Sequence, residues 1–300
     1  MFNREKNQSI ITSWVNLSGA DFNSVLLKVV RERLQRQRPS AILQTFKQNR
    51  FVQPSRINPL ALKTLELSCL QSVQSRGFIP IELSPVAPLG CCAVLAPVNQ
   101  DNVVSAARGV EVLADATNVL ALHLATEYQR NPTRFPSKYA CTQRHVRAQA
   151  YKHPDFTAHF SVLALATAGQ DTGHFAFEAE AVADHIVTHH QLSQTYFPTE
   201  KIAVKIWLRR QDKFFKSQIK QTLLTHLPDQ DITWVDPAEP HNYYPQLQFK
   251  IFLRRTGQEL DLADGGLVDW TQQLLNNRKQ RLMISGLGLE LLAKMRNNKG

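Results

Sequence analysis

The sequence predicts an α+β fold, in which helices flank an antiparallel β-sheet and a helical extension precedes this core. Strand-like and helix-like runs alternate irregularly, without the strict strand–helix–strand repeat of a parallel sheet. Hydrophobic residues make up 43% of the 300 residues, which is enough for a sizeable core. No internal repeat is visible. We therefore expect residues 1–58 to form the extension and residues 59–300 to form one core domain.

Two helices are predicted in the first 75 residues. Apolar side chains recur at helical spacing over Asp21–Gln37 and again over residues 60–75, where Gly77 ends the helix. The segment 31–38 is rich in arginine. Cations near a helix C-terminus are favourable, so a solvated helix end is expected there, with an RNA-binding arm as the alternative.

The remaining elements follow from hydrophobic spacing and from turn residues. Strands are predicted at 78–83, 139–151, 158–168, 202–208, 231–235, 247–253 and 281–285. Helices are predicted at about 115–130, 174–193, 213–226, 266–277 and 287–297.

Composition restricts the class of protein. The chain has 35 basic and 25 acidic residues, a net charge of +10, which favours polyanionic partners such as tRNA or another RNA without proving one. No apolar run approaches the roughly 18 residues of a membrane-spanning helix, and the N-terminus has no signal core. We expect a cytoplasmic protein without a membrane partner. The four cysteines form no Cys-x-x-Cys pair and are expected to be reduced and structural.

The histidines suggest a metal site only weakly. His185 and His189 are four residues apart and would share one helix face. No His-Glu-x-x-His motif or third ligand accompanies them, so a surface helix is expected and no metal site is predicted. Phosphate-binding loops, dinucleotide-binding fingerprints and nucleophile elbows are also missing from the sequence.

Four segments within residues 60–300 resemble, in the right order, the landmarks of class II aminoacyl-tRNA synthetases, and the histidyl-tRNA synthetase branch in particular. Residues 60–87 are similar to motif 1, although Pro85 falls one residue later than usual. In the family this helix and strand form the dimer interface. The resemblance therefore implies a homodimer through residues 60–87.

The second and third segments resemble amino-acid and nucleotide contacts. Asp115 and Thr117 match the chemistry of an Arg-Pro-Glu-Gly-Thr-like turn, with helix capping as the alternative. Residues 143–149 and 158–160 resemble the motif 2 hairpin. Arg147 falls at the arginine that binds the ATP α-phosphate, where a planar guanidinium can pair with two oxygens. Gln149 replaces the expected glutamate, and the loop at 153–157 lacks the second arginine.

The fourth segment combines residues 262–269, similar to a Gly-Gly-Arg-Tyr-Asp turn, with residues 283–292, similar to motif 3. Glycines let the backbone approach a nucleotide closely. Glu290 is retained, but Leu291 replaces the arginine that stacks on adenine, and residues 267–268 replace the Arg-Tyr pair. The Arg-Gly-Leu-x-Tyr-Tyr stretch that recognises histidine is not found, so histidine specificity is not carried over.

The resemblance implies a stand-alone synthetase paralogue, because the chain ends after the motif 3-like helix without an anticodon-binding domain. We expect an amino acid or related small carboxylate in a degenerate adenylate pocket, serving a regulatory or sensing role. An adenylate-forming ligase using ATP and Mg²⁺ is one alternative, and an RNA-binding protein is another. No cofactor and no catalytic residue is assigned. The candidate ligand-binding residues are Arg147, Gln149, Asp115, Thr117, Glu290, Gly286, Gly288 and, near the pocket mouth, Arg108.

Overall fold

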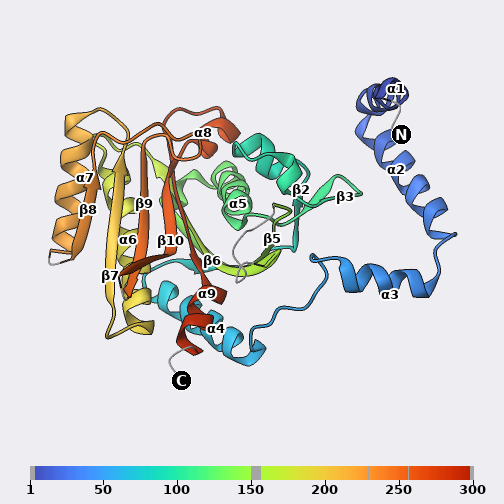
Figure 1. The fold of residues 1–300 in the computed structure, drawn as a ribbon. Helices are drawn as coiled ribbons and strands as arrows, with labels where there is room; N and C mark the ends of the chain where they lie inside the picture. Colours follow the sequence, from blue (N-terminus) through green and yellow to red (C-terminus); the bar gives the residue numbers. More distant parts are fainter. Residues whose placement is uncertain (1–3, 150–156, 229, 256, 298–300) are drawn as a thin grey trace.

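Figure 1 shows the computed structural model, which describes residues 4–149, 157–228, 230–255 and 257–297. A large sheet forms the body, and three N-terminal helices lie to one side of it. Among the described residues, none of the helices is long and apolar enough to span a bilayer.

The N-terminal helices are α1 (Arg4–Val15), α2 (Gly19–Leu34) and α3 (Pro39–Gln48). Only α2 was expected from the sequence. It begins where the Ser18 side chain accepts a hydrogen bond from the amide of Asp21. Neither α2 nor α3 buries a residue. The division of the chain into two domains at residue 58 stays a prediction.

The large sheet has eight strands, and its six inner strands are antiparallel. The spatial order is β1 (Ile79–Pro80), β5 (Ser137–Val146), β6 (His159–Gln170), β11 (Gln280–Gly288), β10 (Gln258–Val268), β9 (Leu247–Arg255), β7 (Lys201–Leu208) and β8 (Asp231–Val235).

The predicted α+β class is confirmed, but the sheet is mixed rather than purely antiparallel. Both edge strands, β1 and β8, run parallel to their neighbours. A parallel pair needs a long crossover, and helix α7 (Lys213–His226) supplies it between β7 and β8.

Helices cover both faces of this sheet. One face packs in a single hydrophobic core against α4 (Pro59–Ser75), α6 (Ala176–Tyr196), α7 and α9 (Leu289–Asn297). A second core lies under α5 (Ala116–Arg130) and α8 (Trp270–Leu275). A small antiparallel sheet lies between α4 and α5 in the chain, and consists of β2 (Val86–Pro88), β4 (Val110–Val112) and β3 (Ser105–Ala106).

The sequence prediction for residues 262–277 was wrong in two respects, because β10 extends to Val268. The predicted helix at 266–277 is shortened to α8, and the predicted glycine turn lies inside β10 between β9 and β11. Its two glycines are needed for close packing. A Cβ atom on Gly266 would lie 2.3 Å from the carbonyl oxygen of Leu247 and 2.5 Å from the ring of Tyr244. The end of the predicted strand 139–151 lies outside the described residues.

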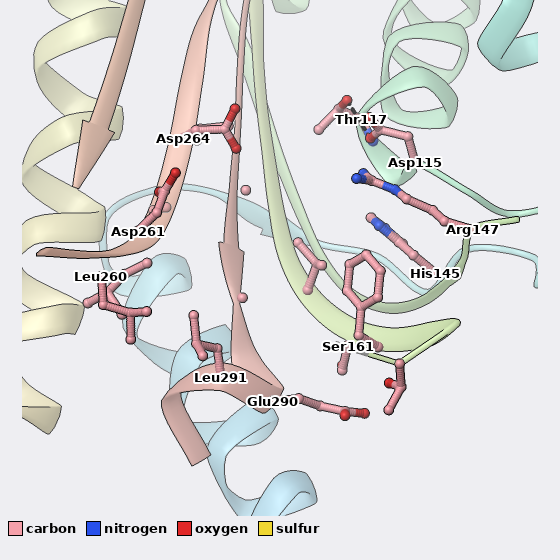
Figure 2. A pocket seen from close by; sticks show the side chains of 18 of the residues that line it. Asp115, Thr117, His145, Arg147, Ser161, Leu260, Asp261, Asp264, Glu290 and Leu291 are labelled. Atoms are coloured by element: carbon pink, nitrogen blue, oxygen red, sulfur yellow. Dashed lines mark hydrogen bonds between the residues drawn. The ribbon is translucent and has the colours of Figure 1, made fainter. Parts of the chain in front are cut away.

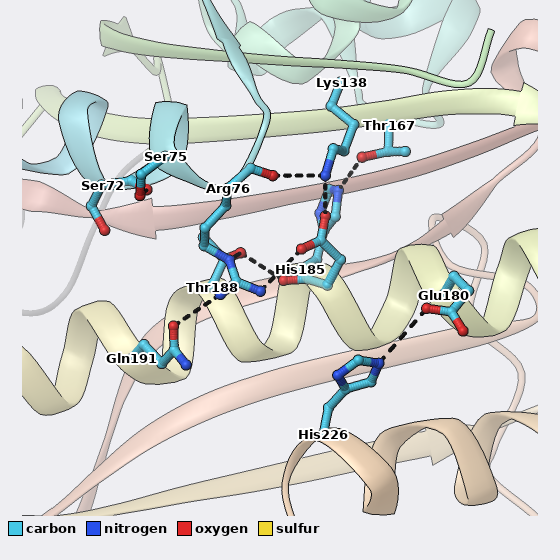
Figure 3. A network of polar contacts seen from close by, with 11 residues as sticks. Ser72, Ser75, Arg76, Lys138, Thr167, Glu180, His185, Thr188, Gln191 and His226 are labelled. Atoms are coloured by element: carbon cyan, nitrogen blue, oxygen red, sulfur yellow. Dashed lines mark hydrogen bonds and ion pairs between the residues drawn. The ribbon is translucent and has the colours of Figure 1, made fainter.

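Polar contacts fasten α6 to the sheet and to the end of α4 (Figure 3). The Lys138 ammonium on β5 donates to the carboxylate of Asp184 at 3.1 Å and to the Arg76 carbonyl at 2.8 Å. The Arg76 guanidinium donates to the same carboxylate at 3.1 Å. One carboxylate therefore joins three elements.

The paired histidines of α6 are buried, so the expected surface helix is wrong. His185 and His189 have no exposed surface, because α6 lies flat against the sheet. A ring nitrogen of each lies 2.7 Å from the Ser285 hydroxyl, and the Thr167 hydroxyl is 2.8 Å from the other nitrogen of His185. Burial lowers the pKa of both imidazoles to about 3, so they are neutral structural groups. All four cysteines are free and buried.

Replacing Gly266 by alanine should lower the free energy of unfolding by about 1–3 kcal/mol, because the added Cβ overpacks β10 against Tyr244. Urea denaturation measures this change. The control is Gly19→Ala in α2, where a Cβ would meet nothing within 4 Å and stability should change by less than about 0.5 kcal/mol. Equal transitions for the two variants would contradict the packing argument.

Candidate ligand-binding site

A cavity of about 380 Å³ lies between the start of α5, the β5–β6 hairpin and strands β10 and β11. Figure 2 shows Asp115, Thr117, His145 and Arg147 on one side and Asp264 across from them. Glu290 and Leu291 lie at the opposite end from Asp115. The hairpin and the turn into α9 thus meet at one cavity over antiparallel strands, as the sequence predicted.

The structure brings six of the eight candidate residues to this cavity. They are Asp115, Thr117, Arg147, Gly286, Gly288 and Glu290. Gln149 lines a second cavity of about 330 Å³ on the other side of Arg147 and Asp115. Arg108 lies in the β3–β4 turn with a φ of 72° and lines neither cavity. Ligand binding by these residues stays a prediction.

Asp115 combines the two roles considered for it. It is the N-cap of α5, and its Oδ1 accepts hydrogen bonds from the amide of Thr117 at 2.9 Å and from the Thr117 hydroxyl at 2.7 Å. Oδ2 accepts from the Tyr243 hydroxyl at 3.0 Å. Burial alone would raise the pKa of Asp115, but Arg147, His145 and the bonds from Thr117 outweigh it and hold the pKa below its usual value. The carboxylate is therefore ionised.

Arg147 is positioned by backbone contacts at the end of the hairpin. Its amide donates to the Ala158 carbonyl at 2.8 Å, which extends the β5–β6 pairing. Its Nε donates to the Ala114 carbonyl at 3.1 Å, and the guanidinium carbon lies 5.3 Å from the centre of the Phe160 ring. These contacts direct the cation toward both cavities.

His145 is a buried residue of the site that the sequence analysis did not select. It is 2% exposed, and its Nε2 accepts a hydrogen bond from the Ala116 amide at 3.1 Å. Burial and the Arg147 charge lower the pKa of His145, against the influence of Asp115. The ring is therefore neutral with its proton on Nδ1, an atom without a hydrogen-bond partner among the described residues.

Tyr243 and Tyr244 were also missed, because the preceding residues 239–241 are Glu-Pro-His rather than Arg-Gly-Leu. The Tyr-Tyr pair, which two residues separate from β9, was the available signal. The Tyr244 hydroxyl donates to Oδ2 of Asp264 at 3.2 Å. Burial raises the pKa of both phenols well above the usual value, so both remain donors.

Asp264 completes an acidic side of the cavity and was not selected either, although it lies in the segment 262–269 that was compared with the glycine turn. Burial and the nearby Asp261 raise the pKa of Asp264 to about 6, and Lys250 and the Tyr244 hydrogen bond offset only part of this effect. A cation placed beside it would favour the ionised carboxylate.

Glu290 is already paired. Its Oε1 lies 2.7 Å from Nη1 of Arg144, and its Oε2 accepts a hydrogen bond from the Ser55 hydroxyl at 3.2 Å. His159 supports this pair, with Nδ1 2.8 Å from Nη1 of Arg144 and Nε2 2.6 Å from the Gln53 carbonyl. The segment before α4 therefore contacts the motif 2-like hairpin and the start of α9.

No cluster of three or more metal-binding side chains occurs within the described parts of the chain. Four residues of the predicted motif 2 loop, His153, Pro154, Asp155 and Phe156, lie outside the described residues.

This arrangement, with the hairpin, the small-residue strand and α9 around one cavity, is the fold of the catalytic core of class II aminoacyl-tRNA synthetases. No protein-family model and no curated protein sequence matches the chain. Solved structures do match it, and several of them are histidyl-tRNA synthetase-like proteins.

One similar structure is an ATP phosphoribosyltransferase regulatory subunit/histidyl-tRNA synthetase from Bacillus halodurans, with a TM-score of 0.64 and 13% identity over 80% of this chain and 81% of that chain. Histidyl-tRNA synthetase from S. aureus matches with a TM-score of 0.62 and 14% sequence identity, over 81% of this chain and 69% of that chain. A histidine–tRNA ligase subunit from Alicyclobacillus acidocaldarius matches with a TM-score of 0.60 and 11% sequence identity, over 83% of this chain and 96% of that chain. At these identities the likeness establishes the fold alone.

Replacing Asp264 by asparagine should raise the free energy of unfolding by about 1–2 kcal/mol at pH 7. The folded state keeps Asp264 protonated up to about pH 6. The unfolded chain releases that proton near pH 4, so this group makes stability fall as pH rises from about 4 to about 6. The buried histidines act oppositely in that range, so the quantity to measure is the difference between wild-type and variant urea midpoints. If the difference in urea midpoint between wild type and variant did not change between about pH 4 and about pH 6, the raised pKa of Asp264 would be contradicted. The same pH dependence in the exposed Asp101→Asn variant would also contradict it.

Proposed function

We propose that this synthetase-like paralogue binds a small zwitterion, an amino acid or a related amino carboxylate, in the 380 Å³ cavity and serves a regulatory or sensing role. The observation that carries the proposal is the placement of the Arg147 guanidinium and the Asp264 carboxylate on opposite sides of one cavity. A guanidinium pairs with a carboxylate, and a buried carboxylate pairs with an ammonium.

The ammonium end of the ligand fits the acidic side of the cavity. Asp264 is mostly ionised at pH 7, although burial raises its pKa to about 6. An ammonium group beside it would return that pKa toward its usual value and would gain a charge-assisted hydrogen bond. The Tyr244 hydroxyl already orients this carboxylate.

The residues at the end of the cavity near Glu290 support the proposal that this protein does not bind ATP as a synthetase does. Leu291 lines it where the family resemblance expects an arginine that stacks on adenine. Glu290, the retained acidic residue, is held by Arg144 and Ser55. Gln149 lies in the second cavity and has no charge to place near a metal–nucleotide complex.

An adenylate-forming ligase is the second candidate. It is favoured by the convergence of Arg147, Gly286, Gly288 and Glu290 on one cavity. Amino-acid-dependent exchange of pyrophosphate into ATP, with Mg²⁺ present, separates the two functions. The sensing role predicts no exchange above background.

We further propose a homodimer through α4 and β1. Leu60, Leu67 and Ile79 leave 78%, 57% and 51% of their surfaces exposed in one copy. Exposed apolar side chains on neighbouring elements are typical of a protein interface.

An RNA partner is favoured only by charge. Residues 1–58 contain ten basic and three acidic side chains, so this segment carries seven of the ten net positive charges. A salt-dependent affinity for tRNA would support this role.

Replacing Arg147 by glutamine should weaken amino-acid binding about 10- to 100-fold, because a charge-assisted pair with the ligand carboxylate is lost. Isothermal titration with the amino acid that most raises the thermal midpoint measures the effect. Arg108→Gln removes the same charge outside both cavities and should leave the affinity unchanged. Equal losses in both variants, or no binding by any of the twenty amino acids, would refute the proposed site.

A further inference from the structure

We propose that the ligand extends beyond the amino-acid cavity, and that its distal part is an uncharged hydrogen-bonding tail, such as an amide or hydroxyl, held in the second cavity. This inference rests on the proposed function. It assigns a second subsite of about 330 Å³ beside the first.

The two cavities are neighbours with a common wall. Five residues line both of them, namely Asp115, Arg147, Tyr243, Tyr244 and Asp264. These residues hold all the charged groups proposed to bind the zwitterion. The proposal places the charged groups of the ligand at these shared residues and its distal part in the second cavity.

The side chains that line only the second cavity carry no net charge. Amide groups come from Asn102, Gln149 and Gln248, and apolar surface comes from Val98 and Val103. The nearby guanidinium groups of Arg209 and Arg50 already donate to Gln248 and to backbone carbonyls. A charged tail would therefore lose its hydration without gaining a countercharge from the side chains that line only this cavity. A neutral tail with donors and acceptors would find amides that can serve as both.

The remaining polar groups of this cavity are also neutral. His241 accepts a hydrogen bond from the Tyr244 amide on Nδ1 at 3.1 Å, and burial, with nearby cations, lowers the pKa of its ring. The Cys92 thiol is buried and stays protonated, because burial and two nearby carboxylates raise its pKa. The chemistry of the subsite is therefore hydrogen bonding, without a thiolate nucleophile.

Hydrogen bonds from neighbouring elements hold the polar groups of this subsite in place. The Ala148 amide donates to the Asn102 carbonyl at 2.8 Å, which ties the end of the hairpin to the 100–102 turn. The guanidinium of Arg50 donates to the carbonyls of Ala148 and Gln149. At Gln248, Oε1 accepts from Nη2 of Arg209 at 3.1 Å, which fixes the orientation of that amide.

These contacts favour an amino acid with an extended amide side chain over a free amino acid of minimal size. The first cavity would hold the α-amino and α-carboxylate groups. The second would hold the end of the side chain, past the Asp115–Tyr243 hydrogen bond.

Isothermal titration with alanine, glutamine and N5-(2-hydroxyethyl)glutamine tests the second subsite. The full chain should bind the hydroxyethyl amide at least about tenfold more tightly than alanine, because two neutral hydrogen bonds are added. An aliphatic amino acid of equal length, 2-aminononanoate, should not show this gain. Equal affinities for alanine and the hydroxyethyl amide would overturn the subsite and leave the proposed amino-acid site intact.

Matched variants locate the effect. Asn102→Leu and Gln149→Leu should abolish most of the tenfold gain and leave alanine binding unchanged, whereas Gln221→Leu on the exposed side of α7 should change neither. Val103→Phe, which fills the cavity, should act like the leucine variants. A gain that survives all three cavity variants would overturn the placement of the tail. Failure of this series and of all twenty amino acids to bind would remove the proposed function itself.

Discussion

The ionised carboxylate of Asp115 at the start of α5 is the group on which the candidate site depends. A buried carboxylate is costly unless it is paired and hydrogen-bonded. Here the charge of Arg147, His145 and the hydrogen bonds from Thr117 keep it ionised, and the Tyr243 hydroxyl satisfies its second oxygen. Satisfying this one group brings together α5, the end of the β5–β6 hairpin and the segment before β9. The cavity is what remains between these elements once the carboxylate has its partners.

Close packing of strand β10 determines the other side of the cavity. Gly266 leaves room for the Tyr244 ring, and the Tyr244 hydroxyl then orients Asp264. The glycine therefore acts on the site through a neighbour, without contacting a ligand itself.

The sequence analysis predicted the features that depend on local pattern and order. The α+β class, helix α5 with its start at Asp115, and the convergence of Arg147 with Glu290 all follow from short segments. It did not predict features that depend on contacts between distant segments. Gly265 and Gly266 are typical of a turn, and only the neighbouring strands explain why they lie within β10.

Burial was the second source of error. His185 and His189 were expected on a surface helix because no metal-binding motif or third ligand accompanies them, yet helix α6 is covered on the side that carries them. Tyr243 and Tyr244 were missed because the motif was sought as a whole stretch, and only its last two residues are present. Asp264 could not be selected, because its raised pKa results from burial that no local pattern reveals.

The segment between α3 and α4 has a practical consequence for anyone shortening this chain. A fragment that began at Pro59 would retain every strand of the large sheet and both hydrophobic cores. It would nevertheless lose the donors that Arg50 supplies to two backbone carbonyls and that Ser55 supplies to Glu290. Residues 49–58 thus belong to the architecture of the pocket, and the sensible place to trim the protein is before Asn49.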